Sequence, residues 1–259
     1  MVIQPEGSMW RAHFLLFAFF SAVARLPAQQ EDLDIDRLEI PAPPPETPVP
    51  YFGLGGGFVG TFLFPKLDAL NTKSQQWDVG TFSQPLFMSG VEGVVTVGLI
   101  PNLRISVFGL GGSKELQKSL SADTQRRAGF ALSATGLSIA YAIVPARSLT
   151  IVPTVSSGWG MLNVEFAQAP THTRWETVSP NSEGPLLHRL TASYLFVHPQ
   201  LYAEYAPLPF LMIRLGGGYQ FSFLGQWEHN RIAVAEGVPA ELNASGASAQ
   251  FAIFVGLFN

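Results

Sequence analysis

The feature that most constrains this chain is an apolar alternation that returns in long runs along most of its length. In the stretch GVVTVGLIPNLRISVFGLGG, residues 93–112, apolar side chains occupy every second position on both sides of Pro101-Asn102. Because successive side chains of a strand point to opposite faces, each run predicts a strand with one apolar face. The Pro-Asn pair predicts a hairpin turn between them. The other face carries small or polar residues such as Thr96 and Arg104.

Eight such runs follow one another, and after residue 50 no segment shows a sustained apolar stripe at helical spacing. They lie near residues 51–64, 89–100, 103–113, 128–143, 149–166, 189–205, 210–224 and 247–258. Several reach the roughly 9–11 residues that a tilted strand needs to cross a bilayer. The runs predict an all-β fold.

The connections between the runs alternate in length. Short ones lie at 101–102, 144–148 and 206–209, and long polar ones at 65–88, 114–127, 167–188 and 225–246. This rhythm is typical of an up-and-down barrel with three short turns at one end and four long loops at the other. We expect both ends of the barrel sequence on the short-turn side.

The composition indicates which face meets water. Charged residues make up 13% of the chain, about half the usual share, while hydrophobic residues reach 47%. In the first run bulky residues such as Phe58 and Phe62 share one face, and Gly55, Gly57 and Thr61 share the other. Small residues fit the narrow lumen of an eight-stranded barrel, so the bulky face is expected to point outward, toward lipid. The predicted fold is an all-β, eight-stranded antiparallel up-and-down transmembrane β-barrel.

The chain is expected to have three parts: a signal peptide at 1–28, an acidic, Pro-rich periplasmic linker at 29–50, and the barrel at 51–259. The run HFLLFAFFSAV is too short to span a bilayer but suits the apolar region of a signal peptide. Cleavage after Ala24 and after Ala28 both fit, as do starts at Met1 and Met9. The linker composition predicts an extended spacer without a core.

From residue 51 the chain resembles the small eight-stranded outer-membrane barrels of the OmpA/OmpX type. The resemblance rests on the loop rhythm, the alternation and the ending FAIFVGLFN. In that family a terminal aromatic is read by the barrel-assembly machinery, whereas here Asn259 follows Phe258. The resemblance implies a multi-pass protein of the outer membrane in a Gram-negative cell envelope. It also implies contact with outer-membrane lipids and lipopolysaccharide, and a chain without a peptidoglycan-binding domain.

Four charged residues fall on the narrow face: Glu92, Arg104, Glu204 and Arg214. An unpaired charge in a water-poor interior costs several kcal/mol, so these residues are expected to pair. Glu204 and Arg214 lie on neighbouring strands across the turn APLP and form the best-supported pair. The group fits a structural plug, which a filled eight-stranded lumen favours, or a gated ion path.

Aromatic residues gather toward the strand ends, as in the interfacial belts of membrane barrels. The expected belts are Tyr51, Tyr141, Tyr202, Tyr205 and Phe210 near the short turns, and Phe64, Phe166, Phe223 and Trp227 near the long loops.

Other chemistry is sparse. The five histidines have no metal-ligand spacing and cysteine is absent, so we expect no metal and no cofactor. A net charge of −4 gives no basic footprint for nucleic acid. Ser193 with His188 or His198 leaves open a lipid-modifying enzyme, but no GxSxG motif is present and a non-enzymatic protein is expected.

The segment 114–127 carries four cations, Lys114, Lys118, Arg126 and Arg127, against two carboxylates. It fits either an anion-binding site for lipopolysaccharide phosphates or a host surface, or a solvated loop tip. The expected function is a structural or surface-interaction role with a closed lumen and long extracellular loops. The alternatives are a lipid-modifying barrel enzyme and a secreted soluble β-barrel that binds a small apolar ligand.

Overall fold

The computed structural model describes residues 52–146, 148–173 and 186–258. All of the described residues belong to one compact unit. The predicted signal peptide and linker, both signal cleavage sites, Tyr51 and Asn259 lie outside the described residues. Within the described residues, no helix combines the length and the hydropathy that a membrane-crossing helix needs.

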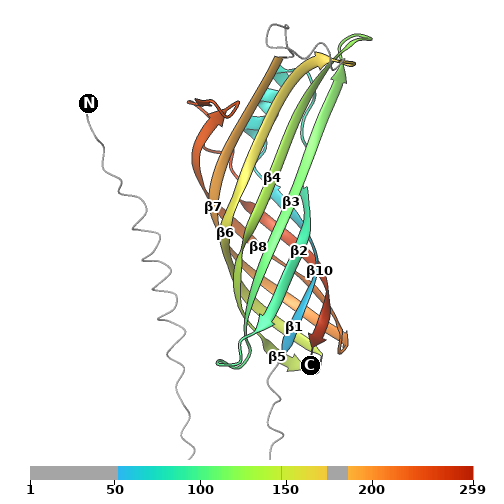
Figure 1. The fold of residues 1–259 in the computed structure, drawn as a ribbon, viewed down its shortest axis with the longest axis vertical. Coiled ribbons are helices and arrows are strands. Elements are labelled where there is room, and N and C mark those ends of the chain that lie inside the picture. Colours follow the sequence, from blue (N-terminus) through green and yellow to red (C-terminus); the bar gives the residue numbers. More distant parts are fainter. Residues whose placement is uncertain (1–51, 147, 174–185, 259) are drawn as a thin grey trace, which may run out of the picture. The chain divides into compact units, whose positions relative to one another are not determined.

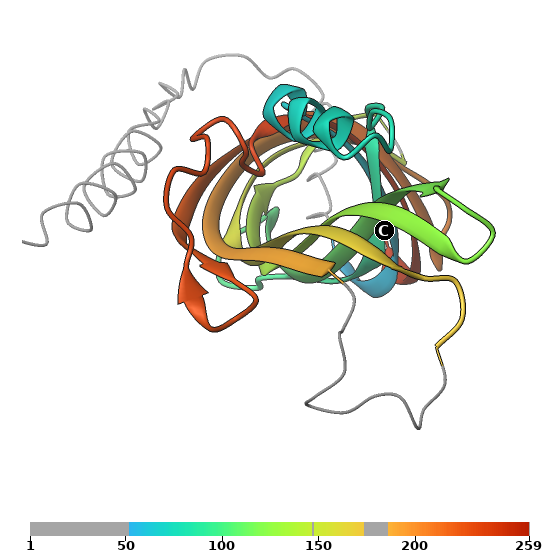
Figure 2. The ribbon, with the colours of Figure 1, turned by 90° about the horizontal axis from the view of Figure 1, so that it is seen from above.

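Eight antiparallel strands form a closed barrel in chain order (Figures 1 and 2). They are β1 (Gly53–Pro65), β2 (Leu86–Thr96), β3 (Leu103–Ser119), β4 (Thr124–Tyr141), β6 (Leu149–Pro170), β7 (Leu186–Leu208), β8 (Leu211–His229) and β10 (Gly246–Phe258). The barrel closes where β10 pairs with both β1 and β8. Two short strands, β5 (Ile143–Ala146) and β9 (Ala233–Val234), pair with β6 and β8. The predicted eight-stranded up-and-down order is confirmed.

The barrel has a turn end, where the connections are short, and a loop end, where they are long. Gly53 pairs with Phe258 at the turn end, so β1 begins and β10 ends there, as expected. The strands differ in height. β1, β2 and β10 have 11–13 residues, whereas β3, β4, β6, β7 and β8 have 17–23 and reach farther toward the loop end (Figure 1).

The expected loop lengths need correction, because the tall strands use much of that sequence. Residues 114–127 belong mostly to β3 and β4, which are joined only by residues 120–123. The connection from β1 to β2 contains a helix, α2 (Asp68–Gln76), that the sequence did not predict. It lies at the rim of the barrel, on the side of the short strands (Figure 2).

Toward the turn end, the apolar face points outward and the polar face inward. On β8, Ile213 and Leu215 are exposed on the outer wall, whereas Arg214 is buried in the lumen. On β1, Phe58 and Phe62 are exposed and Thr61 is buried. The orientation predicted for these strands is confirmed.

Toward the loop end, the tall strands reverse this polarity. On β6 the inward residues change from Thr154 and Ser156 to Leu162, Val164 and Phe166, all buried. Their outward neighbours change from the exposed Trp159 and Met161 to Asn163 and Glu165, which lie beside a polar groove on the outer wall.

Strands β4 and β7 change in the same way. Their inward faces end in apolar residues such as Phe130 and Leu190, and their outward faces carry Arg127 and Arg189. We call the zone of change, near Met161 and Leu195, the polarity boundary.

Helix α2 and the loop that follows it cover the apolar inner surface above this boundary. Leu70, Val79 and Phe82 join the same buried cluster as Phe130 and Phe166. Asn71 fastens the segment: its Oδ1 accepts the Phe82 N–H at 2.7 Å and its Nδ2 donates to the Phe82 carbonyl at 3.2 Å. The loop end is therefore closed by a conventional hydrophobic core.

The predicted aromatic belts are right for some residues and wrong for others. Tyr141, Tyr205 and Phe210 are exposed toward the turn end, and Phe64 and Phe223 toward the loop end. By contrast, Tyr202, Phe166 and Trp227 are buried inside the barrel. Tyr202 shares the inward parity of Glu204, so alternation would have placed it correctly.

Candidate functional site

The four predicted lumen charges come from four different strands. Glu92 lies on β2, Arg104 on β3, Glu204 on β7 and Arg214 on β8, each at an inward position of its strand. Their side chains are only 1–6% exposed. The structure brings all four together.

The side chains form a chain of alternating charge, from Arg104 to Glu204, Arg214 and Glu92. Arg104 is ion-paired to Glu204, with Nη2 donating to Oε1 at 2.8 Å. Arg214 donates from Nε to the same Glu204 oxygen at 2.8 Å, and from Nη1 to both Glu92 oxygens at 2.8 and 2.9 Å. Two carboxylates and two guanidinium groups balance, so the charges can stay ionised in a low-dielectric lumen.

Aromatic rings hold the Arg214 guanidinium from its sides. Its central carbon lies 4.9 Å from the Tyr202 ring centroid and 4.5 Å from that of Phe254. Cation–π attraction adds to the ion pairs at such distances. Arg214 is therefore fixed by two carboxylates and two rings, which is the arrangement of a plug.

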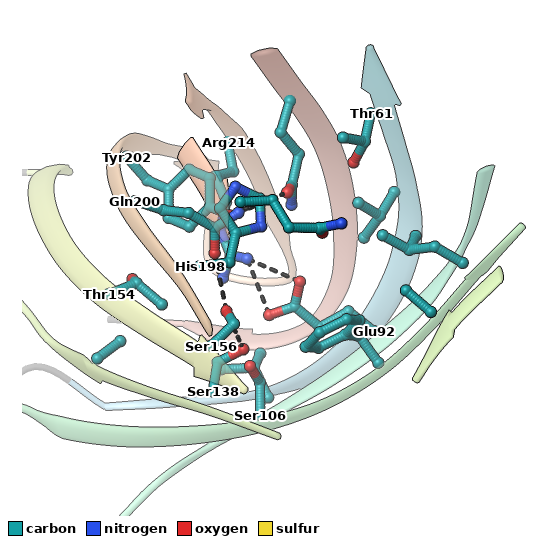
Figure 3. Close-up of a pocket in the computed structure, with 18 of the residues that line it drawn as sticks. Thr61, Glu92, Ser106, Ser138, Thr154, Ser156, His198, Gln200, Tyr202 and Arg214 are labelled. Carbon is teal, nitrogen blue, oxygen red and sulfur yellow. Dashed lines mark hydrogen bonds and ion pairs between the residues drawn. The ribbon is translucent and has the colours of Figure 1, made fainter. Parts of the chain in front are cut away.

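Hydrogen-bonded polar residues surround a small cavity beside this chain (Figure 3). Ser138 and Ser156 share a hydrogen bond of 2.8 Å, Ser156 donates to Gln200 at 2.8 Å, and Tyr202 donates to Gln250 at 2.9 Å. The cavity has about 30 Å³, which is room for about two water molecules. At this level the lumen is filled by side chains.

The four cations predicted as an anion-binding loop lie along the β3–β4 hairpin, where Lys118 and Arg126 are opposite one another. Lys114 donates to the carbonyl and hydroxyl of Ser83 at 2.7 and 3.1 Å, and Lys118 pairs with Asp78 at 2.7 Å. Arg126 contacts Gln168 and the Trp77 carbonyl, and Arg127 pairs with Glu115. They belong mostly to the strands β3 and β4 rather than to a loop, and anion binding by these four residues stays a prediction.

The histidines and the serine considered for catalysis are also separated. Ser193 is exposed on the outer wall, whereas His198 is buried in the lumen and hydrogen-bonds to Ser248 at 2.8 Å. His188 is bonded to His229, with ring nitrogens 3.0 Å apart. The structure therefore does not bring Ser193 and His198 together.

Metal ligands show no clustering in the described ranges. In residues 52–146, 148–173 and 186–258, no group of three or more His, Cys, Asp or Glu side chains is placed to hold a metal ion.

A further feature, which the sequence did not indicate, lies on the outer wall beyond the polarity boundary. A groove of about 290 Å³ runs over β3, β4, β6 and β7. Its charged lining includes Arg127, Arg189 and Arg231 with Glu115 and Glu165. These residues come from the strands β3, β4, β6 and β7 and from the turn after β8, which holds Arg231, and the barrel's register brings them together.

Comparison with known proteins gives distant likenesses only. No protein-family model and no curated protein matches the chain. Among solved structures, it is similar to Ail, the attachment invasion locus protein of Yersinia pestis, both alone and in complex with the heparin analogue sucrose octasulfate. Each alignment has 7% identity and covers 81% of this chain and 99% of Ail, with a TM-score of 0.37 for the complex and 0.34 for Ail alone. At such values the function has to be argued from this chain's own residues.

Proposed function

We propose that this chain is an integral β-barrel protein of a bacterial outer membrane, with a closed lumen and a structural or surface-interaction role. The polarity boundary carries the proposal. Below it, exposed apolar residues such as Trp159 and Leu201 cover the outer wall. Above it, the outer wall carries charges and the inner face is apolar. An outer wall that is apolar along one part of its strands and charged along the other matches a barrel whose strands extend from the bilayer into water.

A secreted soluble barrel is less well supported. Such a protein would bury its bulky residues along the full height of each strand and leave polar groups outside. Here Leu195, Leu215 and Phe223 are each about 60% exposed, and the interior beside the charge chain has room for about two water molecules rather than for an apolar ligand.

A lipid-modifying enzyme is also less well supported, because Ser193 and His198 face opposite sides of the wall and cannot act as a catalytic pair. We therefore favour a non-enzymatic role, with the barrel-assembly machinery and lipopolysaccharide as expected partners. The loop end would be the part presented outside the cell.

Fractionation of a Gram-negative host that expresses the full chain tests the location. The protein should sediment with the outer membrane, resist extraction by urea, and dissolve only in detergent. Recovery in the soluble periplasm without detergent would contradict the proposal.

Two matched substitutions on the outer face of β7 sharpen this test. Leu201→Arg would place a charge in the lipid-facing belt and should cost about 2–4 kcal/mol of stability if Leu201 lies near the bilayer midplane. Leu187→Arg makes the same change on the same strand beyond the polarity boundary, where Leu187 is also exposed, and should cost less than about 0.5 kcal/mol. Reversible urea unfolding in vesicles measures both. Equal tolerance of the two substitutions would contradict a lipid-facing wall.

A further inference from the structure

We propose that the outer groove beyond the polarity boundary is a binding site for the phosphate of a glycolipid headgroup in the surrounding leaflet, with Arg127, Arg189 and Arg231 as its donors. This inference rests on the proposed membrane location. Of the four cations expected to bind anions at 114–127, Lys114 and Arg127 line this groove.

The position of the groove on the outer wall suits a lipid headgroup. The groove is lined by outward residues of β3, β4 and β6, including Glu115, Arg127 and Glu165, and opens on the wall rather than into the lumen. Glu165 lies four residues beyond Met161, the last exposed apolar residue of β6. At about 3.3 Å per residue and a tilt near 45°, this is roughly 9 Å above the apolar belt, within the headgroup region.

The charge of the groove suits an anionic ligand. Arg189 gives Nε and Nη2 to one oxygen of Glu165, at 2.9 and 2.6 Å, and Arg127 pairs with Glu115. Each carboxylate in the groove is thus matched by an arginine. Within the described part of the chain, no carboxylate forms an ion pair with Arg231. Three guanidinium groups and the Lys114 ammonium against two carboxylates leave a positive groove with donors suited to phosphate.

The backbone turn at Asn230 and Arg231 fixes the position of Arg231. Asn230 and Arg231 have φ angles of 52° and 61°, in the left-handed region that non-glycine residues seldom adopt. Asn230 holds this turn against β7, since its Oδ1 accepts the Arg189 N–H at 2.8 Å and its Nδ2 donates to the Leu187 carbonyl at 3.1 Å. The turn is thereby fixed beside Arg189, and Arg231 reaches the groove.

The size of the groove fits a sugar phosphate better than a bare ion. Its volume of about 290 Å³ is close to the lower limit for small-molecule pockets, roughly 300 Å³. A lipid anchored in the same leaflet would present its phosphate laterally, which is the direction in which this groove opens.

The test is a titration of lipid A into the purified full chain in detergent micelles, followed by native mass spectrometry. We expect wild type to bind lipid A and to bind dephosphorylated lipid A about tenfold more weakly, since a charge-assisted hydrogen bond is lost. Arg231→Gln should weaken lipid A binding by about the same factor. Lys118→Gln removes one positive charge from the hairpin tip and should leave the affinity unchanged.

A second variant tests the placement of the arginine. Asn230→Gly permits the left-handed turn but removes the two side-chain contacts to β7, so lipid A binding should weaken while all three arginines remain. Circular dichroism and thermal unfolding show whether each variant is folded.

Equal weakening of lipid A binding by Arg231→Gln and Lys118→Gln would show that lipid A responds to the net positive charge of the protein, and would overturn the proposed site. If millimolar inorganic phosphate abolishes lipid A binding, the groove is a site for free phosphate and not for the phosphate of a lipid headgroup. If the protein inserts into outer-membrane vesicles but does not bind lipid A, the proposed role of the groove is wrong and the proposed membrane location is retained. If it does not enter them, the proposed function itself fails.

Discussion

At the scale of single residues, Arg214 is the centre of the lumen. It bridges Glu92 and Glu204, and Glu204 in turn holds Arg104. The sequence predicted the inward position of each residue and the pairing across the β7–β8 turn. It could not predict that Arg104 pairs with Glu204 and Glu92 with Arg214, because the distances between these residues across the lumen depend on the barrel's register.

The chain of charges makes a graded prediction about stability. Arg214→Met leaves Glu92 buried without its guanidinium partner and should cost about 3–5 kcal/mol. Adding Glu92→Gln removes that stranded charge while the Arg104–Glu204 pair remains, so the double variant should be more stable than Arg214→Met alone. Urea unfolding in vesicles compares the two.

The same logic gives a control. Glu204→Leu with Arg214→Met removes the two central members and takes the ion-pair partner from both Glu92 and Arg104, so this pair of changes should bring no relief. A double variant with Glu204→Leu that is as stable as wild type would show that the charges do not act as one chain.

At the scale of elements, the parts of the tall strands below the polarity boundary could be predicted from the sequence, and the parts above it could not. Below the polarity boundary the alternation is strong because lipid and lumen demand opposite residues, and those parts of β1, β3 and β8 were predicted correctly. Above it, β3 and β4 stand in water on one side, so residues such as Lys114 and Glu115 look like loop. Phe166 and Trp227 were assigned to a belt because an aromatic residue suits both a lipid interface and a buried core.

Helix α2 escaped prediction for a related reason. It has nine residues and only Leu70 and Ser74 are buried in it, so its apolar stripe is too short to stand out. Its position is set by Asn71 and by the core it covers, which are tertiary features.

The ion pair between Lys118 of the β3–β4 hairpin and Asp78 of the loop after α2 leads to a prediction about the pKa of Asp78. A hydrogen bond and ion pair from Lys118 hold the pKa of the exposed Asp78 below its ordinary value of 3.8. Since the folded-state pKa is lowered, the contact contributes above the ordinary pKa and is lost only as the pH falls through the lowered value. In Lys118→Met, carboxyl NMR should show the pKa of Asp78 rising toward 3.8, and an unchanged pKa would exclude this contact in solution.

At the scale of the whole molecule, the lumen is blocked twice, by the charge chain with its polar surroundings and by the apolar core beneath α2. The cavity of about 30 Å³ offers no continuous path. Purified protein in planar bilayers should therefore show no large, stable conductance at neutral pH. Regular open-channel steps would favour the gated ion path over the plug.

The proposed membrane location requires that the outer wall between the turn end and the polarity boundary face lipid, and the cysteine-free chain permits a direct measurement. Single cysteines at consecutive positions 211–223 of β8, spin-labelled in reconstituted vesicles, report access to oxygen from the lipid and to a nickel chelate from water. The account predicts a two-residue period, with high oxygen access at outward positions such as 213, 215, 219 and 221 and low access at 214 and 220. High nickel access at the outward positions, or oxygen access at the inward ones, would show that the barrel does not present this wall to a membrane.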